Sequence, residues 1–94
     1  MTRIGDLEKQ SGILRITVFL YDREEYMLSR IWPDSGVSIN QGYKALDKMR
    51  ELKMIKSRID NSSYPPRNYI SLTDKGKKIA AKLKEIEDFL KEEQ

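Results

Sequence analysis

The feature that most constrains the fold is a turn-rich segment at residues 61–68, NSSYPPRN, between two short stretches of strand-like sequence. Residues 54–59 before it and 67–72 after it alternate polar with apolar side chains over part of their length. Alternation with a period of two is typical of half-buried strands, and two such runs around a turn predict a β-hairpin. Because Pro65 and Pro66 cannot continue a central strand, we expect the loop to project from the domain.

A capped helix is predicted upstream of this hairpin, over residues 38–52. Ser38 and Gln41 stand three residues apart, which is the spacing of a capping box at a helix start. Gly42 costs about 1 kcal/mol relative to Ala inside a helix, so we expect it to mark a close approach to a neighbouring element. Apolar residues recur at steps of three and four and predict the buried stripe Ile39, Tyr43, Leu46 and Met49, with Ala45 and Leu52 beside it. The opposite, exposed side is predicted to carry Asn40, Gln41, Lys44 and Lys48.

The segments on either side of this helix and hairpin are predicted to be mainly helical. Residues 13–21 are rich in β-branched and aromatic types that favour a strand, but their apolar positions also fit a buried helix, which we prefer. A short strand is predicted at 25–27 and a short helix at 28–34, made irregular by Pro33. A final helix is predicted from Thr73 and Asp74 to about residue 92.

The final helix carries an apolar stripe with the four-three-four spacing of a coiled-coil face. Two interpretations are open: the stripe packs on its own domain, or it joins two copies of the chain. A small domain leaves little apolar surface on which a helix of about twenty residues can pack, which favours dimerisation. The predicted dimerisation residues are Ile79, Leu83, Ile86 and Leu90.

Length and composition exclude several classes of protein. A chain of 94 residues is expected to form one domain with a modest core. It contains no cysteine and no histidine, so disulfides, zinc sites of the usual kinds, thiol nucleophiles and histidine bases are excluded. No cofactor and no enzymatic activity are expected. Its longest apolar-leaning run, at residues 13–21, is too short to span a bilayer, and the first residues lack the pattern of a signal peptide, so a cytoplasmic protein is expected.

Positive charge is concentrated in the middle of the chain. Residues 1–37 contain five basic and six acidic side chains, and residues 73–94 contain six of each. Residues 38–72 contain seven basic and only three acidic side chains, which is the entire positive excess of the protein. A local excess of this kind is typical of an anion-binding surface, although an ordinary solvated surface is the alternative.

The sequence resembles winged helix-turn-helix proteins, in particular the MarR- and PadR-like transcriptional regulators of archaea and bacteria. The likeness lies in residues 37–55, where the recognition helix leads into the wing, and in residues 66–76, where an Arg, a Tyr and Leu-Thr-x-x-Gly close the wing. Gly42 and Lys53 depart from the pattern, which usually has an apolar residue and a glycine there. The resemblance implies an α+β, mostly α fold with a three-helix core, a β-hairpin wing and a long carboxy-terminal helix. Residues 1–76 would form the winged-helix domain and residues 77–94 a dimerisation helix.

The resemblance also implies binding to double-stranded DNA by a homodimer, with helix 38–52 in the major groove and wing 60–68 on the adjacent backbone or minor groove. Asn40 and Gln41 carry amides suited to an adenine edge, while lysines and arginines suit phosphates. Tyr64 with its two prolines is a stiff wedge for the minor groove. The predicted DNA-binding residues are Ser38, Asn40, Gln41, Lys44, Lys48, Lys56, Arg58, Tyr64 and Arg67.

Other interpretations of these residues remain open. Gln41 is equally suited to completing the capping box, and Arg58 and Arg67 are placed to pair with Asp60 across the hairpin. The alternative functions are a winged-helix protein-interaction module and a sequence-tolerant architectural DNA protein. An interaction module predicts an exposed apolar patch on the recognition helix, whereas the side predicted to be exposed is polar.

Overall fold

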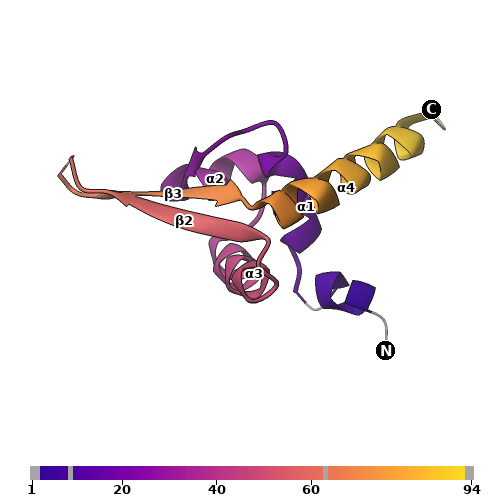
Figure 1. Ribbon diagram of the computed structural model, residues 1–94, viewed down its shortest axis with the longest axis horizontal. Coiled ribbons are helices and arrows are strands. Elements are labelled where there is room, and N and C mark those ends of the chain that lie inside the picture. The colour runs from indigo at the N-terminus through magenta and orange to yellow at the C-terminus, as the bar shows by residue number, and fades with distance from the viewer. Residues whose placement is uncertain (1–2, 9, 63, 93–94) are drawn as a thin grey trace.

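The computed structural model describes residues 3–8, 10–62 and 64–92, and Figure 1 shows their arrangement. A short 3-10 helix at the amino-terminal end precedes four α-helices and three strands. In chain order the elements are η1 (Arg3–Glu8), α1 (Ile13–Leu20), β1 (Tyr26–Met27), α2 (Leu28–Ser35), α3 (Ile39–Glu51), β2 (Ile55–Asp60), β3 (Arg67–Leu72) and α4 (Asp74–Glu92). All the elements expected from the sequence are present, with bounds that differ by one or two residues.

The three strands form one antiparallel sheet in the order β1-β3-β2. Strands β2 and β3 pair over their full length, from Ile55 opposite Leu72 to Asp60 opposite Arg67. The two-residue strand β1 adds to the other edge of β3, with Tyr26 opposite Ile70. The predicted hairpin and the predicted third strand are therefore confirmed. We call β2, β3 and the loop between them the wing hairpin, and residues 60–68 the wing loop.

Helix α1 runs through the centre of the core. Ile13, Ile16 and Leu20 are fully buried, as the three- and four-residue steps of a buried helix require. The hydroxyl of Thr17 is buried with them and donates to the carbonyl oxygen of Ile13 at 2.7 Å, so it carries no unsatisfied donor. Strand propensity in this segment is overridden by burial against α3, α4 and the sheet.

Helix α3 packs on the core through a face that differs from the predicted stripe. Its buried residues are Gly42, Ala45, Leu46 and Met49. A Cβ on Gly42 would overlap the ring of Trp32. Helix α3 can therefore approach α2 this closely only because Gly42 has no side chain. The predicted close approach at Gly42 is confirmed, but the predicted burial of Ile39 and Tyr43 is wrong: their exposed fractions are 56% and 51%.

The two ends of the wing hairpin are tied to the start of α4. Lys53 adopts a left-handed conformation with φ of 61°, the position that a glycine usually takes at a helix end. The hydroxyl of Thr73 donates to the Lys53 carbonyl at 2.7 Å and accepts from the Gly76 backbone N–H at 3.1 Å. A Cβ on Gly76 would overlap the Met54 carbonyl oxygen, so α4 begins directly against the entry to β2.

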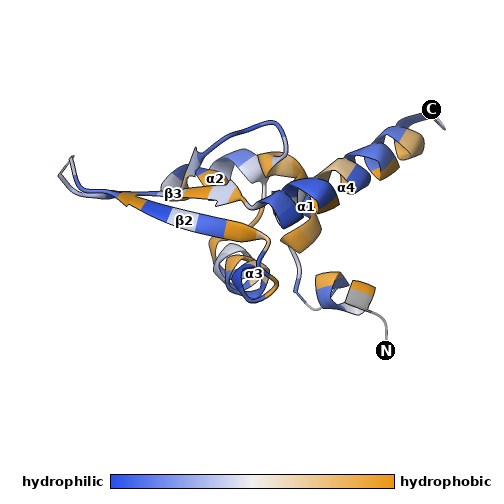
Figure 2. Ribbon diagram, viewed as in Figure 1, coloured by the Kyte–Doolittle hydropathy of each residue, from blue (hydrophilic) through white to orange (hydrophobic). Residues whose placement is uncertain are grey.

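The molecule is elongated, with extents of 46 × 33 × 25 Å, because its two outer elements project in opposite directions (Figure 1). The wing loop forms one end of the long axis and α4 forms the other. Figure 2 shows hydrophilic residues over most of the wing hairpin and hydrophobic residues near the free end of α4. No helix in the described part of the chain is long and apolar enough to cross a membrane.

Candidate nucleic-acid interface

The outward ridge of α3 carries polar side chains. With Gly42, Ala45, Leu46 and Met49 buried, the helical repeat of 3.6 residues places the opposite side near Asn40, Lys44 and Asp47. All three are exposed. Asn40 lies in the first turn, which is the part of a recognition helix that meets base edges, and Lys44 lies one turn further on. The structure therefore puts these two predicted contacts together on one surface.

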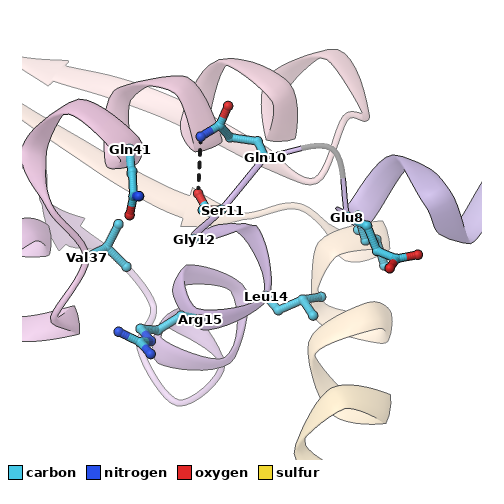
Figure 3. Close-up of a pocket in the computed structure, with 9 residues that line it drawn as sticks. Glu8, Gln10, Ser11, Gly12, Leu14, Arg15, Val37 and Gln41 are labelled. Carbon is cyan, nitrogen blue, oxygen red and sulfur yellow. Dashed lines mark hydrogen bonds between the residues drawn. The ribbon is translucent and has the colours of Figure 1, made fainter.

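Gln41 and Lys48 lie on the flank of α3 that faces α1 and η1. Gln41 lines a cleft with Gly12, Arg15 and Val37, and its side chain points toward Val37 (Figure 3). Its backbone N–H donates to the Ser38 hydroxyl at 3.4 Å, so Ser38 caps the helix as predicted. Lys48 was predicted to be exposed, but only 25% of its side chain is accessible. The two residues are turned away from the wing hairpin.

The opposite flank of α3, toward the wing hairpin, is apolar. Ile39 and Tyr43 lie one turn apart on it, and the Tyr43 ring packs on Trp32 with 5.1 Å between ring centroids. The sequence signal for this exposure is Gly42. A stripe built from the glycine and the residues three, four and seven positions later has helical spacing too, and it leaves Ile39 and Tyr43 at its margin.

Charges along α3 are largely paired within the helix. Arg50 contacts Asp47 at 3.2 Å and Lys48 contacts Glu51 at 3.1 Å. Arg50 also donates to the Ser57 hydroxyl at 3.2 Å, which links α3 to β2. Among the described residues Lys44 has no ion pair, so it is the lysine of this helix that is ready to meet a phosphate.

In the wing hairpin Arg58 is engaged by a residue far away in sequence. Its guanidinium donates to both carboxylate oxygens of Glu25, at 2.8 and 2.9 Å, and lies 4.8 Å from the Tyr69 ring centroid. The hydrogen bond and charge of Arg58, with the charge of Lys56, hold the pKa of Glu25 below its usual value. The predicted alternative of an Arg58–Asp60 pair is therefore wrong, because Glu25 is the partner. Lys56 stays exposed on the same strand.

The wing loop presents an exposed tip. Tyr64 is 99% exposed and Arg67, at the start of β3, is exposed as well. The Asp60 carboxylate accepts from the Ser62 backbone N–H and hydroxyl, and these hydrogen bonds lower the pKa of Asp60. A cleft of about 440 Å³ joins this loop to α3, and it is lined by Met27, Leu28, Ser29, Tyr43, Tyr64, Pro65, Pro66, Arg67 and Asn68.

The four residues predicted to form a dimerisation stripe on α4 divide into two pairs. Ile79 packs against the core and Leu83 lines a groove with α1, so both are half-buried in their own domain. Ile86 and Leu90, on the projecting half of the helix, line the same groove but are 53% and 67% exposed. Phe89 lies beside them and is also exposed. The first half of the stripe therefore packs on its own domain, the second half is more exposed, and dimerisation through it stays a prediction.

Several solved structures superpose on this chain and have a similar fold. ZitR from Lactococcus lactis superposes with a TM-score of 0.73 over 97% of this chain, at 22% sequence identity. AbfR, whose structure was determined in its reduced form bound to DNA, superposes with a TM-score of 0.67 over 86% of this chain, at 18% identity. The chain has the winged-helix fold of transcriptional regulators. Its fold class was therefore predicted correctly from the sequence.

This chain covers only part of the length of several of these regulators. It spans 69% of ZitR and 60% of AbfR. It spans 98% of a transcriptional regulator homologue from Pyrococcus horikoshii, with a TM-score of 0.66 and 22% identity over 96% of this chain. No protein-family model matches the sequence, and neither does any curated protein.

Proposed function

We propose that this protein is a small dimeric transcriptional regulator that binds double-stranded DNA. In this proposal α3 enters the major groove and the wing hairpin lies on the adjacent backbone or minor groove. The observation that carries it is the shared surface of α3 and the wing loop: the cleft lined by Tyr43 and Arg67 joins the ridge of Asn40 and Lys44 to the exposed tip. This surface combines groups suited to base edges with cations suited to phosphates.

The solved neighbours support this proposal through their fold. AbfR was determined with DNA bound, and other neighbours include ZitR and MepR. The chain also carries its whole positive excess in residues 38–72, which contain α3 and the wing hairpin. A positive surface of this kind attracts a duplex irrespective of sequence, since phosphate contacts dominate affinity.

Dimerisation is proposed through the projecting half of α4. Ile86, Phe89 and Leu90 form an exposed apolar group there, and exposed groups of this kind mark interaction sites. A change of Leu90→Glu is expected to convert a dimer into a monomer in analytical ultracentrifugation without unfolding the chain, because Leu90 lies outside the core. An unchanged sedimentation coefficient would place the interface elsewhere.

Lys44 provides a direct test of the DNA proposal. Lys44→Ala is expected to weaken binding to duplex DNA by roughly eight-fold for each protomer at about 0.1 M salt, because one phosphate contact is lost. Lys78→Ala makes the same charge change on the exposed surface of α4 and serves as the matched control. Fluorescence anisotropy measures both. Equal affinities of the two variants for DNA would show that the DNA-binding surface lies elsewhere than on α3.

One observation favours a second function. Ile39 and Tyr43 form an exposed apolar pair on α3, which is what a protein-interaction module would present. Such a module would bind no duplex at low salt. An architectural DNA protein, the third candidate, would bind every duplex with similar affinity, so comparing random with selected sequences distinguishes it from a regulator.

A further inference from the structure

The most unusual side chain on the α3 surface is Ile39. It is the first residue of the helix, it is 56% exposed, and it lies outside the hydrophobic core cluster. Tyr43, the next residue on the same flank, has a ring contact with Trp32 that accounts for its position. Packing on the core cluster does not account for Ile39 in the same way. A β-branched apolar side chain at this point therefore needs another explanation.

The surroundings of Ile39 suit a base edge. Asn40 follows it directly and is exposed, and an asparagine amide matches the N6 and N7 atoms of adenine. Thymine is the base that offers an apolar group in the major groove, its C5-methyl. On the neighbouring ridge of α3 the carboxylate of Asp47 contacts Arg50 at 3.2 Å. The first turn of α3 contains no acidic residue that would repel a duplex.

We infer that Ile39 is a specificity-determining residue that contacts a thymine C5-methyl group, beside an adenine read by Asn40. The inference rests on the proposed DNA binding and names the bases that the start of α3 prefers. The preferred site then contains a thymine next to the adenine contact in each half-site. Burying one methyl group between Ile39 and the base corresponds to about a four-fold gain in affinity.

The test begins with selection of duplexes from a random library by the full chain. In the selected site each thymine is replaced in turn by uracil, which differs only in lacking the C5-methyl group. Wild type is expected to lose about four-fold in affinity at one position of each half-site. Ile39→Ala is expected to bind more weakly and to show no loss with uracil at that position.

The control variant is Ile4→Ala, which shortens an exposed isoleucine in η1 in the same way. It should retain the uracil sensitivity of wild type. Three outcomes would overturn the inference: no thymine position is sensitive to uracil, Ile39→Ala keeps the sensitivity, or selection returns no preferred sequence. In the first two the proposed function survives if duplexes are still bound, whereas the third with random duplexes still bound indicates the architectural DNA protein. If no duplex is bound at low salt, both fail, and Ile39 and Tyr43 become the candidate contact for a protein.

Discussion

Helix α3 and the wing hairpin form two parts of one surface, and they are built in opposite ways. The helix is fixed by a full face packed on the core, with Gly42 against Trp32 and Met49 fully buried. The wing hairpin is fixed mainly by the pairing of β2 with β3, and most of its side chains are exposed. The packed helix therefore holds its side chains in fixed directions, whereas the hairpin projects from the domain with most of its side chains exposed.

Helix α3 and the wing hairpin also differ in how their charges are paired. Helix α3 has three basic and two acidic residues and pairs most of them internally, while the wing hairpin has three basic residues and one acidic residue. Positioned amide and apolar groups read sequence, and unpaired cations supply affinity that does not depend on sequence. The comparison suggests that specificity resides in α3 and that much of the affinity resides in the wing hairpin.

The largest effect is expected from the wing hairpin. Replacing Lys56 and Arg67 together by Ala should remove two phosphate contacts for each protomer and weaken duplex binding by roughly 60-fold for each protomer at about 0.1 M salt. The ratio of affinities for selected and random duplexes should stay the same, since neither residue reads a base. Anisotropy titrations on both duplexes measure this. A fall in that ratio would show that the wing hairpin also contributes to specificity.

The next effect concerns the packing of α3 against α2. Gly42→Ala should lower the free energy of unfolding by about 2 kcal/mol, because overlap with Trp32 outweighs the roughly 1 kcal/mol that Ala gains in helix propensity. Urea unfolding followed by circular dichroism measures it. Gly5→Ala is the control, since a Cβ there meets nothing within 4 Å. A Gly42→Ala variant as stable as wild type would mean that α3 packs less closely than described.

The smallest effect concerns the pair between Glu25 and Arg58. Glu25→Gln should leave Arg58 available for a phosphate, so binding should tighten by up to about five-fold and the salt dependence should steepen. Glu24→Gln changes the same charge on the neighbouring exposed residue and is the control. Weaker binding by Glu25→Gln would indicate that the pair positions the wing hairpin instead.

The same pair predicts a pH dependence of stability. Because the folded protein holds the pKa of Glu25 below its ordinary value of 4.5, ionised Glu25 contributes stability above that pH. The contribution is lost as the pH falls through the lowered pKa. Wild type should therefore be more stable than Glu25→Gln at neutral pH, and urea unfolding should show the difference shrinking as the pH falls below 4.5. A difference that does not change with pH would contradict this linkage.

Local sequence patterns predicted most of the fold. The prolines of the wing loop, the alternation on both sides of it and the Ser38 cap each act over a few residues, and the structure has the hairpin and the capped helix where they indicate. Lys53 stands where the pattern usually has a glycine, and it takes the left-handed conformation of a helix end that a glycine usually takes. These features depend on backbone geometry, which neighbouring residues determine.

The surface was harder to predict because it depends on contacts between distant segments. The buried face of α3 is set by Trp32 pressing on Gly42, and this contact turned Ile39 and Tyr43 outward. Arg58 pairs with Glu25, 33 residues away, so nothing in the hairpin sequence indicated that partner. The burial of the α4 stripe likewise depends on α1, whose residues line a groove with Leu83, Ile86 and Leu90.

The proposed binding of a DNA duplex by α3 and the wing hairpin is tested by the salt dependence of binding to a random-sequence duplex. Fluorescence anisotropy between about 50 and 200 mM salt covers the range in which phosphate contacts are apparent. A dimer that neutralises several phosphates should give a slope of log K against log salt of roughly −4 to −8. No binding at the lowest salt, or a slope near zero, would contradict the DNA proposal.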